Sequence, residues 1–262
     1  MPSWVPDWNS PLVVNSLTTP LHEPNWGASG TSSWEVPESQ LYQPTLPVRG
    51  WKVATISAAA RGKFSLSKAA LIAADTPAIY PWTPGSVTRV EALWRTLVAD
   101  HVDRQHPALP HREHDFRRQW ARESDEARKS CEPSRMPVPQ DARETLRRFR
   151  DAEAKLGIGA GDVVDAAREE RAANEFGFVS RYRRTSYART VFRTDAGQLG
   201  NGPRRLEVGD QVWVLAGASV PFVLRAQARG GYQLVGEAYV HGIMNGEALD
   251  APDAKAEQIE LV

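Results

Sequence analysis

The sequence predicts an α+β protein in which a small C-terminal antiparallel β-barrel or curled sheet follows helices and an irregular N-terminal segment rich in tryptophan and proline. Over residues 189–249, short β-branched and aromatic runs alternate with glycine-containing turns, which is the pattern of a small barrel. Residues 89–101 and 141–156 carry apolar side chains at helical spacing. The chain has 9 tryptophans and 19 prolines, and both residue types are concentrated early.

The first part of the chain, residues 1–101, is expected to be largely irregular. Prolines recur through residues 1–45, and each removes a backbone donor and biases the preceding residue toward extended geometry, so no long helix is expected there. Residues 46–57 alternate apolar and polar side chains with a break near Gly50, which indicates a strand with a bulge. Residues 89–101 form one apolar stripe, which predicts an amphipathic helix.

The middle of the chain, residues 102–176, is expected to be a charged helical insertion. Acidic and basic side chains nearly cancel over 112–129, a pattern typical of a solvated helix. Residues 141–156 begin with a capping aspartate and end before Gly157, which favours a helix with a defined start and stop. A further helix is expected over 162–174.

The last part of the chain, residues 177–250, is expected to be the antiparallel β module. Glycine turns separate strands expected at 190–194, 211–215, 220–225 and 232–240. The turn Asp195-Ala196-Gly197 marks a hairpin after the first of them. Residues 251–262 are expected to be a tail.

Composition excludes several classes of function. The 262 residues carry a formal net charge of +0, so no global field points to nucleic acid or to an anionic membrane. No apolar run approaches the ~20 residues of a membrane span, and the N-terminus lacks the basic and apolar regions of a signal peptide. The single cysteine, Cys131, excludes a disulfide framework and a cysteine-rich zinc site, and it fits a reducing, cytoplasmic setting.

The run over residues 236–249 holds the most informative polar side chains. If residues 237–241 form a regular strand, then Glu237, Tyr239 and His241 project from one face, because alternate side chains of a strand point the same way. A carboxylate, a phenol and an imidazole side by side favour either a proton-sharing cluster or a hydrogen-bond network that holds the strand in place.

In the turn that follows, Met244 and Glu247 complete this candidate interaction or ligand cluster. No nucleophile accompanies it, so no residue is assigned a catalytic role and no enzyme is expected.

Other motifs are weaker. Gly157–Gly161 has the wrong spacing and follows a helix, so it predicts an interhelix loop and not a phosphate cradle. Gly27–Gly30 lacks the context of a nucleophile elbow, and Arg181–Arg184 is interpreted as a local basic face. His111 and His114 share a helix face in a polar, proline-broken region, and no metal or cofactor is expected.

Several segments resemble the C-terminal region of fungal heterokaryon incompatibility proteins, the family that carries an N-terminal HET domain. In chain order, they are Pro2–Trp8, Leu46–Gly50, Trp94–Leu97, Phe192–Gly200, Gly209–Asp210, Pro221–Arg225 and Tyr239–Met244. The last of these, Tyr-Val-His-Gly-Ile-Met, is the most specific. The motifs of the HET domain itself, Y-x-W-G, D-x-x-C-I-N-Q and V-W-x-L-Q-E, do not occur in this sequence.

The resemblance implies a role in fungal nonself recognition and programmed cell death. In this family the HET domain is regarded as the cell-death effector and is related to TIR-type domains, so effector activity is not assigned to residues of this chain. We expect either a truncated gene product or a C-terminal region that acts alone, as a non-catalytic regulatory or recognition region whose protein partner is a HET effector domain in cis or in trans. Trp4, Trp8 and Trp26 then form the seam to that missing domain, with exposed apolar surface around them.

Two alternatives stay open at the level of sequence. A small-ligand-binding domain or enzyme would use Glu237, Tyr239 and His241, and it requires a concave pocket in which the three side chains converge. A fragment without independent function is the other alternative.

Overall fold

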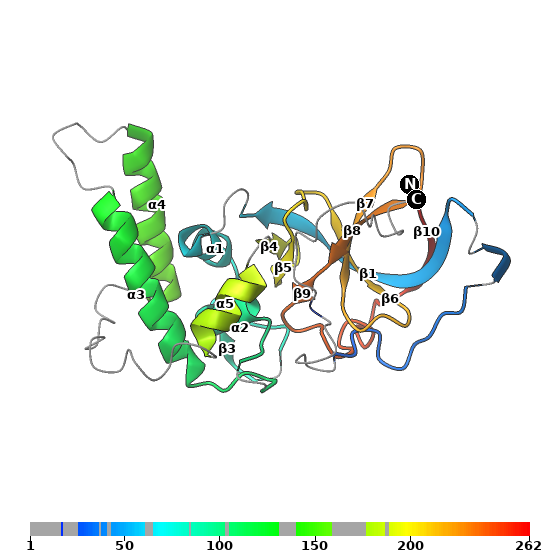
Figure 1. Ribbon diagram of the computed structural model, residues 1–262, viewed down its shortest axis with the longest axis horizontal. Coiled ribbons are helices and arrows are strands. Elements are labelled where there is room, and N and C mark those ends of the chain that lie inside the picture. The colour runs from blue at the N-terminus through cyan, green and yellow to red at the C-terminus, as the bar shows by residue number, and fades with distance from the viewer. Residues whose placement is uncertain are drawn as a thin grey trace.

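The computed structural model describes most of the chain. The described residues are 17, 26–36, 38–40, 43–60, 65–83, 85–102, 105–130, 140–158, 177–186 and 189–262. Trp4, Trp8, Cys131 and the helix expected over 162–174 lie outside them. The α+β class predicted from the sequence is confirmed, with the longest helices at one end of the molecule and a barrel at the other (Figure 1).

Strands at one end of the molecule close into a barrel. They are β1 (Leu46–Ala59), β6 (Gln211–Leu215), β7 (Phe222–Ala226), β8 (Tyr232–Glu237) and β10 (Ala256–Leu261). The strands from β6 to β8 pair antiparallel, β8 meets β10 in parallel, and β1 pairs antiparallel with both β10 and β6, which closes the ring. All five strands contribute apolar side chains to the barrel core, with Trp213, Leu215, Leu224, Ile259 and Leu261 buried.

A second sheet continues from the end of β1. It contains β4 (Arg189–Thr194), β5 (Leu199–Pro203) and β9 (Tyr239–Val240), each antiparallel to its neighbour. Figure 1 shows β1 as a long curved strand that runs from the helical side into the barrel. Because β1 belongs to both sheets, its pairing positions the barrel against the rest of the fold.

The curvature of β1 comes from two irregularities. The register shifts between Lys52 and Ala54 and again between Ile56 and Ala58, so the bulges lie beyond the position expected near Gly50. Bulges of this kind bend a strand and increase its twist. Gly50 has a different role, because a Cβ there would lie only 2.9 Å from a backbone carbonyl oxygen of β6.

Helices cover the second sheet. They are α1 (Leu66–Ala73), α2 (Arg89–Val98), α3 (Arg112–Ser130), α4 (Gln140–Leu156) and α5 (Phe178–Ser186), with a short 3-10 helix at Glu38–Gln40 and a small hairpin of β2 (Ile79–Tyr80) and β3 (Val87–Thr88). The start of α2 is capped by the side chain of Thr88, which accepts a hydrogen bond from the backbone N–H of Glu91. α1 and α2 pack on β4 and β5. No helix within the described ranges is long and apolar enough to cross a membrane.

α3 and α4 form a hairpin that stands away from the barrel (Figure 1). The expectation that 112–129 is a solvated helix is wrong for one face, because Phe116 and Trp120 are buried. Trp120 stacks on Phe149 of α4 with ring centroids 5.4 Å apart. α4 ends as expected at Gly157, which has a φ of +65°.

The division of the chain differs from the expected one at two points. Residues 177–186 form α5, so the part assigned to the β module begins with a helix. Residues 256–261 are not a tail but β10, which pairs with β1 along six registered residue pairs from Leu46↔Leu261 to Trp51↔Ala256. Pairing across more than 200 residues leaves no local signal in a short polar strand, which explains why β10 was missed.

Candidate functional site

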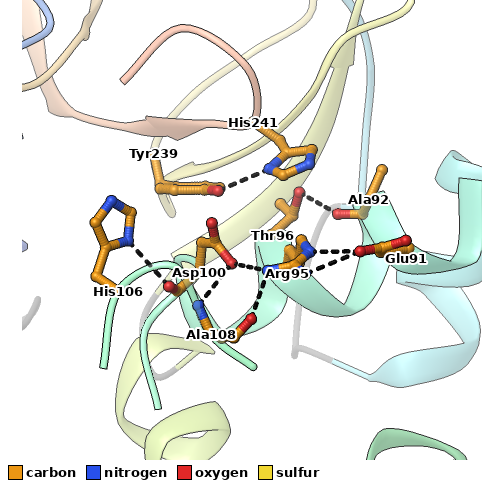
Figure 2. Close-up of polar contacts among 9 residues, drawn as sticks. All are labelled: Glu91, Ala92, Arg95, Thr96, Asp100, His106, Ala108, Tyr239 and His241. Atoms are coloured by element: carbon orange, nitrogen blue, oxygen red, sulfur yellow. Dashed lines mark hydrogen bonds and ion pairs between the residues drawn. The ribbon is translucent and has the colours of Figure 1, made fainter. Parts of the chain in front are cut away.

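The run predicted to carry the site lies between the barrel and the helices. The expected single strand over 237–241 is wrong, because the chain leaves β8 after Glu237 and re-forms β9 at Tyr239. Gly236 has a φ of +146°, a conformation that side chains resist, and it marks this break. Tyr239 and His241 are nevertheless adjacent and buried, with exposed fractions of 1% and 4%. Tyr239 Oη and His241 Nδ1 share a hydrogen bond of 2.8 Å (Figure 2).

The turn after His241 is held by close backbone contacts. The hydroxyl of Tyr80 donates to the carbonyl oxygen of His241 at 2.9 Å and accepts the backbone N–H of Leu199 at 2.9 Å. Gly242 has a φ of +90°, and a Cβ there would lie 2.3 Å from the carbonyl oxygen of Trp82. Only glycine fits this position, so the glycine in the Tyr-Val-His-Gly-Ile-Met run has a backbone role.

An ion pair at the end of α2 faces the Tyr239–His241 pair (Figure 2). The chain turns sharply there, because Ala99 and Asp100 both have positive φ, at 52° and 49°. Asp100 pairs with Arg95, which also binds Glu91 at 2.9 Å and donates to the carbonyl oxygen of Ala108 at 2.8 Å. These contacts join the end of α2 to the segment that follows it.

His106 joins this arrangement from the loop after α2. Its Nδ1 donates to the backbone carbonyl oxygen of Asp100, at a distance of 3.0 Å. Figure 2 shows its ring on the opposite side of Asp100 from Arg95. The polar cluster therefore combines side chains of β9, α2 and the loop after α2.

Burial governs the protonation of the cluster. Burial, together with the nearby Arg95 guanidinium, lowers the pKa of His241 to about 3. Burial also raises the pKa of Tyr239 well above its usual value, with the Asp100 carboxylate adding to the effect. The pKa of Asp100 is raised by burial against the opposing charge of Arg95. Near neutral pH the phenol and the imidazole are therefore both uncharged.

A neutral pair of this kind is poorly suited to acid–base chemistry. Moving the shared proton would create opposite charges in a site that water does not reach. His241 Nε2 is buried and finds no hydrogen-bond partner within the described part of the chain. The contacts of the two side chains are those of a hydrogen-bonded packing network.

Glu237 and Glu247 do not complete a catalytic cluster. Glu237 binds Arg189 Nη2 at 2.6 Å and accepts the backbone N–H of Leu17 at 2.5 Å. Arg189 is 2% exposed, so Glu237 neutralises a buried cation. Glu247 is exposed and accepts the backbone N–H of Asn245 at 2.7 Å. Met244 is buried, and its sulfur accepts the backbone N–H of Val240 at 3.4 Å.

Trp26 packs directly on this cluster. Its ring centroid lies 6.0 Å from that of Tyr239 and 6.0 Å from that of His106, the latter in an edge-on arrangement. With an exposed fraction of 4%, Trp26 is buried in this chain's own core beside Ala99, Val220 and Met244. The prediction that exposed apolar surface surrounds Trp26 is therefore wrong. The seam prediction for Trp4 and Trp8 concerns residues outside the described part of the chain.

Backbone hydrogen bonds fasten the residues after Trp26 to the same region. We call residues 26–32 the strap. The backbone N–H of Gly27 donates to Met244 at 3.1 Å, that of Ala28 to Ser219 at 3.2 Å, and that of Ser29 to Ala218 at 3.2 Å. The carbonyl oxygen of Ser32 accepts the N–H of Gly217 at 2.9 Å. Trp26, one residue of the predicted seam, is far from the polar cluster in sequence. In the fold, the two thus lie against each other.

The other sequence motifs lead elsewhere. His111 and His114 lie at the exposed start of α3, and no group of three metal-binding side chains occurs in the described ranges. In the basic face of α5, Arg181 Nε donates to the carbonyl oxygen of Val98 at 3.2 Å, which is a structural contact.

Sequence reasoning missed the partners of the cluster. Arg95 is 8% exposed, and Glu91 one helical turn earlier was a readable signal for an ion pair within α2. Asp100 and His106 had no such signal, because a left-handed corner brings them under Tyr239.

Comparisons with known proteins agree with the resemblance seen in the sequence. A family model described as the Het-6 beta-barrel domain matches residues 64–258. The heterokaryon incompatibility protein 6, OR allele, of Neurospora crassa is 43% identical over 74 residues, which cover 27% of this chain and 11% of that protein. No solved structure matches. Because the family match spans well over half of the chain, the chain belongs to the Het-6 beta-barrel domain family of heterokaryon-incompatibility-type proteins.

Proposed function

We propose that this chain is a non-catalytic regulatory or recognition region of a heterokaryon-incompatibility-type protein, acting through protein contacts in fungal nonself recognition and programmed cell death. The observation that carries the proposal is the state of the Tyr239–His241 pair. Both side chains are buried and uncharged near neutral pH. They hold the C-terminal run in place, and substrate chemistry would need groups that water or substrate can reach.

The contacts of Glu237 support the same view. An enzyme built on Glu237, Tyr239 and His241 needs the three side chains to converge on one reacting atom. Instead, the carboxylate of Glu237 is bound to the buried cation of Arg189 and to the backbone N–H of Leu17. The carboxylate of Glu237 therefore joins separate segments of the chain.

A protein partner follows from the proposed role. The aligned stretch of the Neurospora crassa protein is 11% of that protein's length, so the similar region is a small part of a much larger relative. We propose a HET effector domain, in cis or in trans, as the partner that this region restrains or triggers. A cytoplasmic setting accompanies the proposal, and the presence of a single cysteine supports it.

Gene replacement tests both the heterokaryon incompatibility role and the non-catalytic character that we propose. In the fungus that carries this gene, the wild-type allele is compared with a deletion and with His241→Asn in pairings against a panel of wild isolates, and heterokaryon growth is scored. Asparagine retains a polar group beside Tyr239 and removes the imidazole. We expect the deletion to change at least one pairing and the His241→Asn strain to behave as wild type.

Two results contradict the proposal separately. Pairings that are unchanged by the deletion across the panel would remove the heterokaryon incompatibility role. A His241→Asn strain that behaves like the deletion, although its protein is folded and present at the wild-type level, would show that the imidazole itself has a chemical task.

A further inference from the structure

The strap is held the way a bound peptide is held. Three of its backbone N–H groups and one carbonyl oxygen pair with the backbone of 217–219 and Met244. Backbone contacts of this kind give affinity to a peptide segment without reading its sequence. Specificity must then come from the side chains that the strap buries.

One side chain dominates this burial. Trp26 fills a space bounded by Ala99, Val220, Tyr239 and Met244, with the ring of His106 at its edge. Trp26 Nε1 is buried and has no hydrogen-bond partner among the residues that the structure describes. The space is therefore selective for the shape and apolar surface of a large aromatic ring and not for its donor.

Two of the residues after Trp26, Ala28 and Ser29, are small and buried. Ala28 is fully buried and Ser29 is 4% exposed, so longer side chains have no room at either position. Gly30 has a φ of +56°, which favours glycine, and its Cα faces Gly246 across the contact. The backbone turns over residues 28–31, where the N–H of Gly30 donates to the carbonyl oxygen of Gly27 at 2.8 Å. The occupant that fits is therefore a segment in which a tryptophan is followed by a turn of small residues.

The strap and the surface beneath it differ in their position relative to the family match. We call Ala99, His106, residues 217–220, Tyr239 and Met244 the seat. All of the seat lies inside the stretch 64–258 that matches the family domain, whereas the strap lies before it. The receiving surface thus lies within the matched stretch, and its occupant lies before that stretch, as β1 also does.

We propose that the seat is a peptide-recognition site for a protein segment that carries a tryptophan and then turns through small residues. In this chain the strap occupies the seat as an internal ligand, and a partner segment of the same chemistry binds by displacing it. This inference rests on the proposed recognition function and gives that function a location. The polar cluster beneath the seat holds Tyr239 in the orientation that contacts the tryptophan ring.

Peptide binding to the full chain provides the test. The probe is a fluorescently labelled synthetic peptide of residues 24–34, and binding is followed by anisotropy. The proteins are wild type, Trp26→Ala, which vacates the aromatic space, and Trp34→Ala as a matched control. Trp34 lies on the same segment but binds the carbonyl oxygen of Pro47 through its indole N–H, away from the seat.

The expected result is selective binding to the vacated seat. The peptide should bind Trp26→Ala at least about tenfold more tightly than it binds wild type or Trp34→Ala, because an internal ligand competes at high effective concentration. A peptide with alanine in place of its own tryptophan should lose this binding.

Several results would overturn the proposal. A folded Trp26→Ala chain that binds the peptide no better than Trp34→Ala does would do so. If Trp26→Ala unfolds, Trp26→Leu takes its place, and unfolding of both variants would make the strap a fixed part of the core. The heterokaryon pairings are independent of this assay, so a gene effect without peptide binding refutes the seat alone. Peptide binding without a gene effect refutes the incompatibility role alone.

Discussion

Acid should destabilise this chain partly through one buried histidine, His241. The pKa of its ring falls from an ordinary value of 6.5 to about 3 in the folded chain. Between these values the unfolded chain binds a proton at this ring and the folded chain does not, so stability that is present above pH 6.5 is lost as the pH falls toward 3. The slope approaches about 1.4 kcal/mol per pH unit, which amounts to about 2 kcal/mol between pH 7.5 and pH 5.

The variant His241→Asn isolates this contribution. Asparagine does not titrate, and it retains a group that can share a hydrogen bond with Tyr239 Oη. At pH 7.5 the variant should be less stable than wild type by about 1–3 kcal/mol, because packing and hydrogen bonding are imperfect. At pH 5 the difference should shrink or reverse, since the wild type alone loses the histidine contribution.

The assay is urea denaturation at several pH values, followed by tryptophan fluorescence and circular dichroism. Other titrating groups are common to both proteins, so the difference between the two stability curves reports the histidine. His114→Asn, at an exposed position on α3, is the control and should follow the wild type. Parallel curves for wild type and His241→Asn from pH 7.5 to pH 5 would refute the reasoning, because they would mean that the ring protonates equally easily in both states.

Three further predictions concern the fold around the site. Glu237→Gln should lower the free energy of unfolding by about 3 kcal/mol, because it removes the carboxylate that pairs with the buried Arg189 cation, and adding Arg189→Met should recover much of that loss. Additive effects in this double-mutant cycle would contradict the coupling. A fragment of 64–258, the extent of the family match, should fail to show a cooperative thermal transition, since it lacks β1. Gly242→Ala should lower stability by at least about 2 kcal/mol, whereas Gly230→Ala, which has a similar φ but open space around it, should cost about 1 kcal/mol; equal effects would contradict the steric argument.

Local patterns were sufficient for most elements of the fold. The strands of the barrel from β6 to β8 were found because glycine turns and alternating side chains act over a few residues. The end of α4 followed for the same reason, since a glycine stop is set by neighbours in sequence. The helix predicted over 89–101 ends three residues earlier, at Val98, where the chain turns into a left-handed corner. The residues of the C-terminal run were also found, because a phenol and an imidazole in an apolar strand stand out.

The way in which these elements pair and pack on one another had no such local signal. Half of the residues of β10 are polar, and most of its pairing is with β1, more than 200 residues away in sequence. Trp26 looked like part of a seam to another domain, because a tryptophan in a proline-rich segment gives no indication of its partner. Tertiary packing decided that it lies against Tyr239 and His106.

The contrast between local patterns and tertiary packing also applies to the candidate site. Residue types and spacing identified Tyr239 and His241 as neighbours, which is a short-range property of the backbone. Whether they form a reactive pair or a packing network depends on burial, and burial depends on contacts with Arg95, Asp100 and the strap that lie more than 100 residues away in sequence. Solvent exclusion is a collective result of the folded chain, and it is what sets the pKa of His241 and therefore the character of the site.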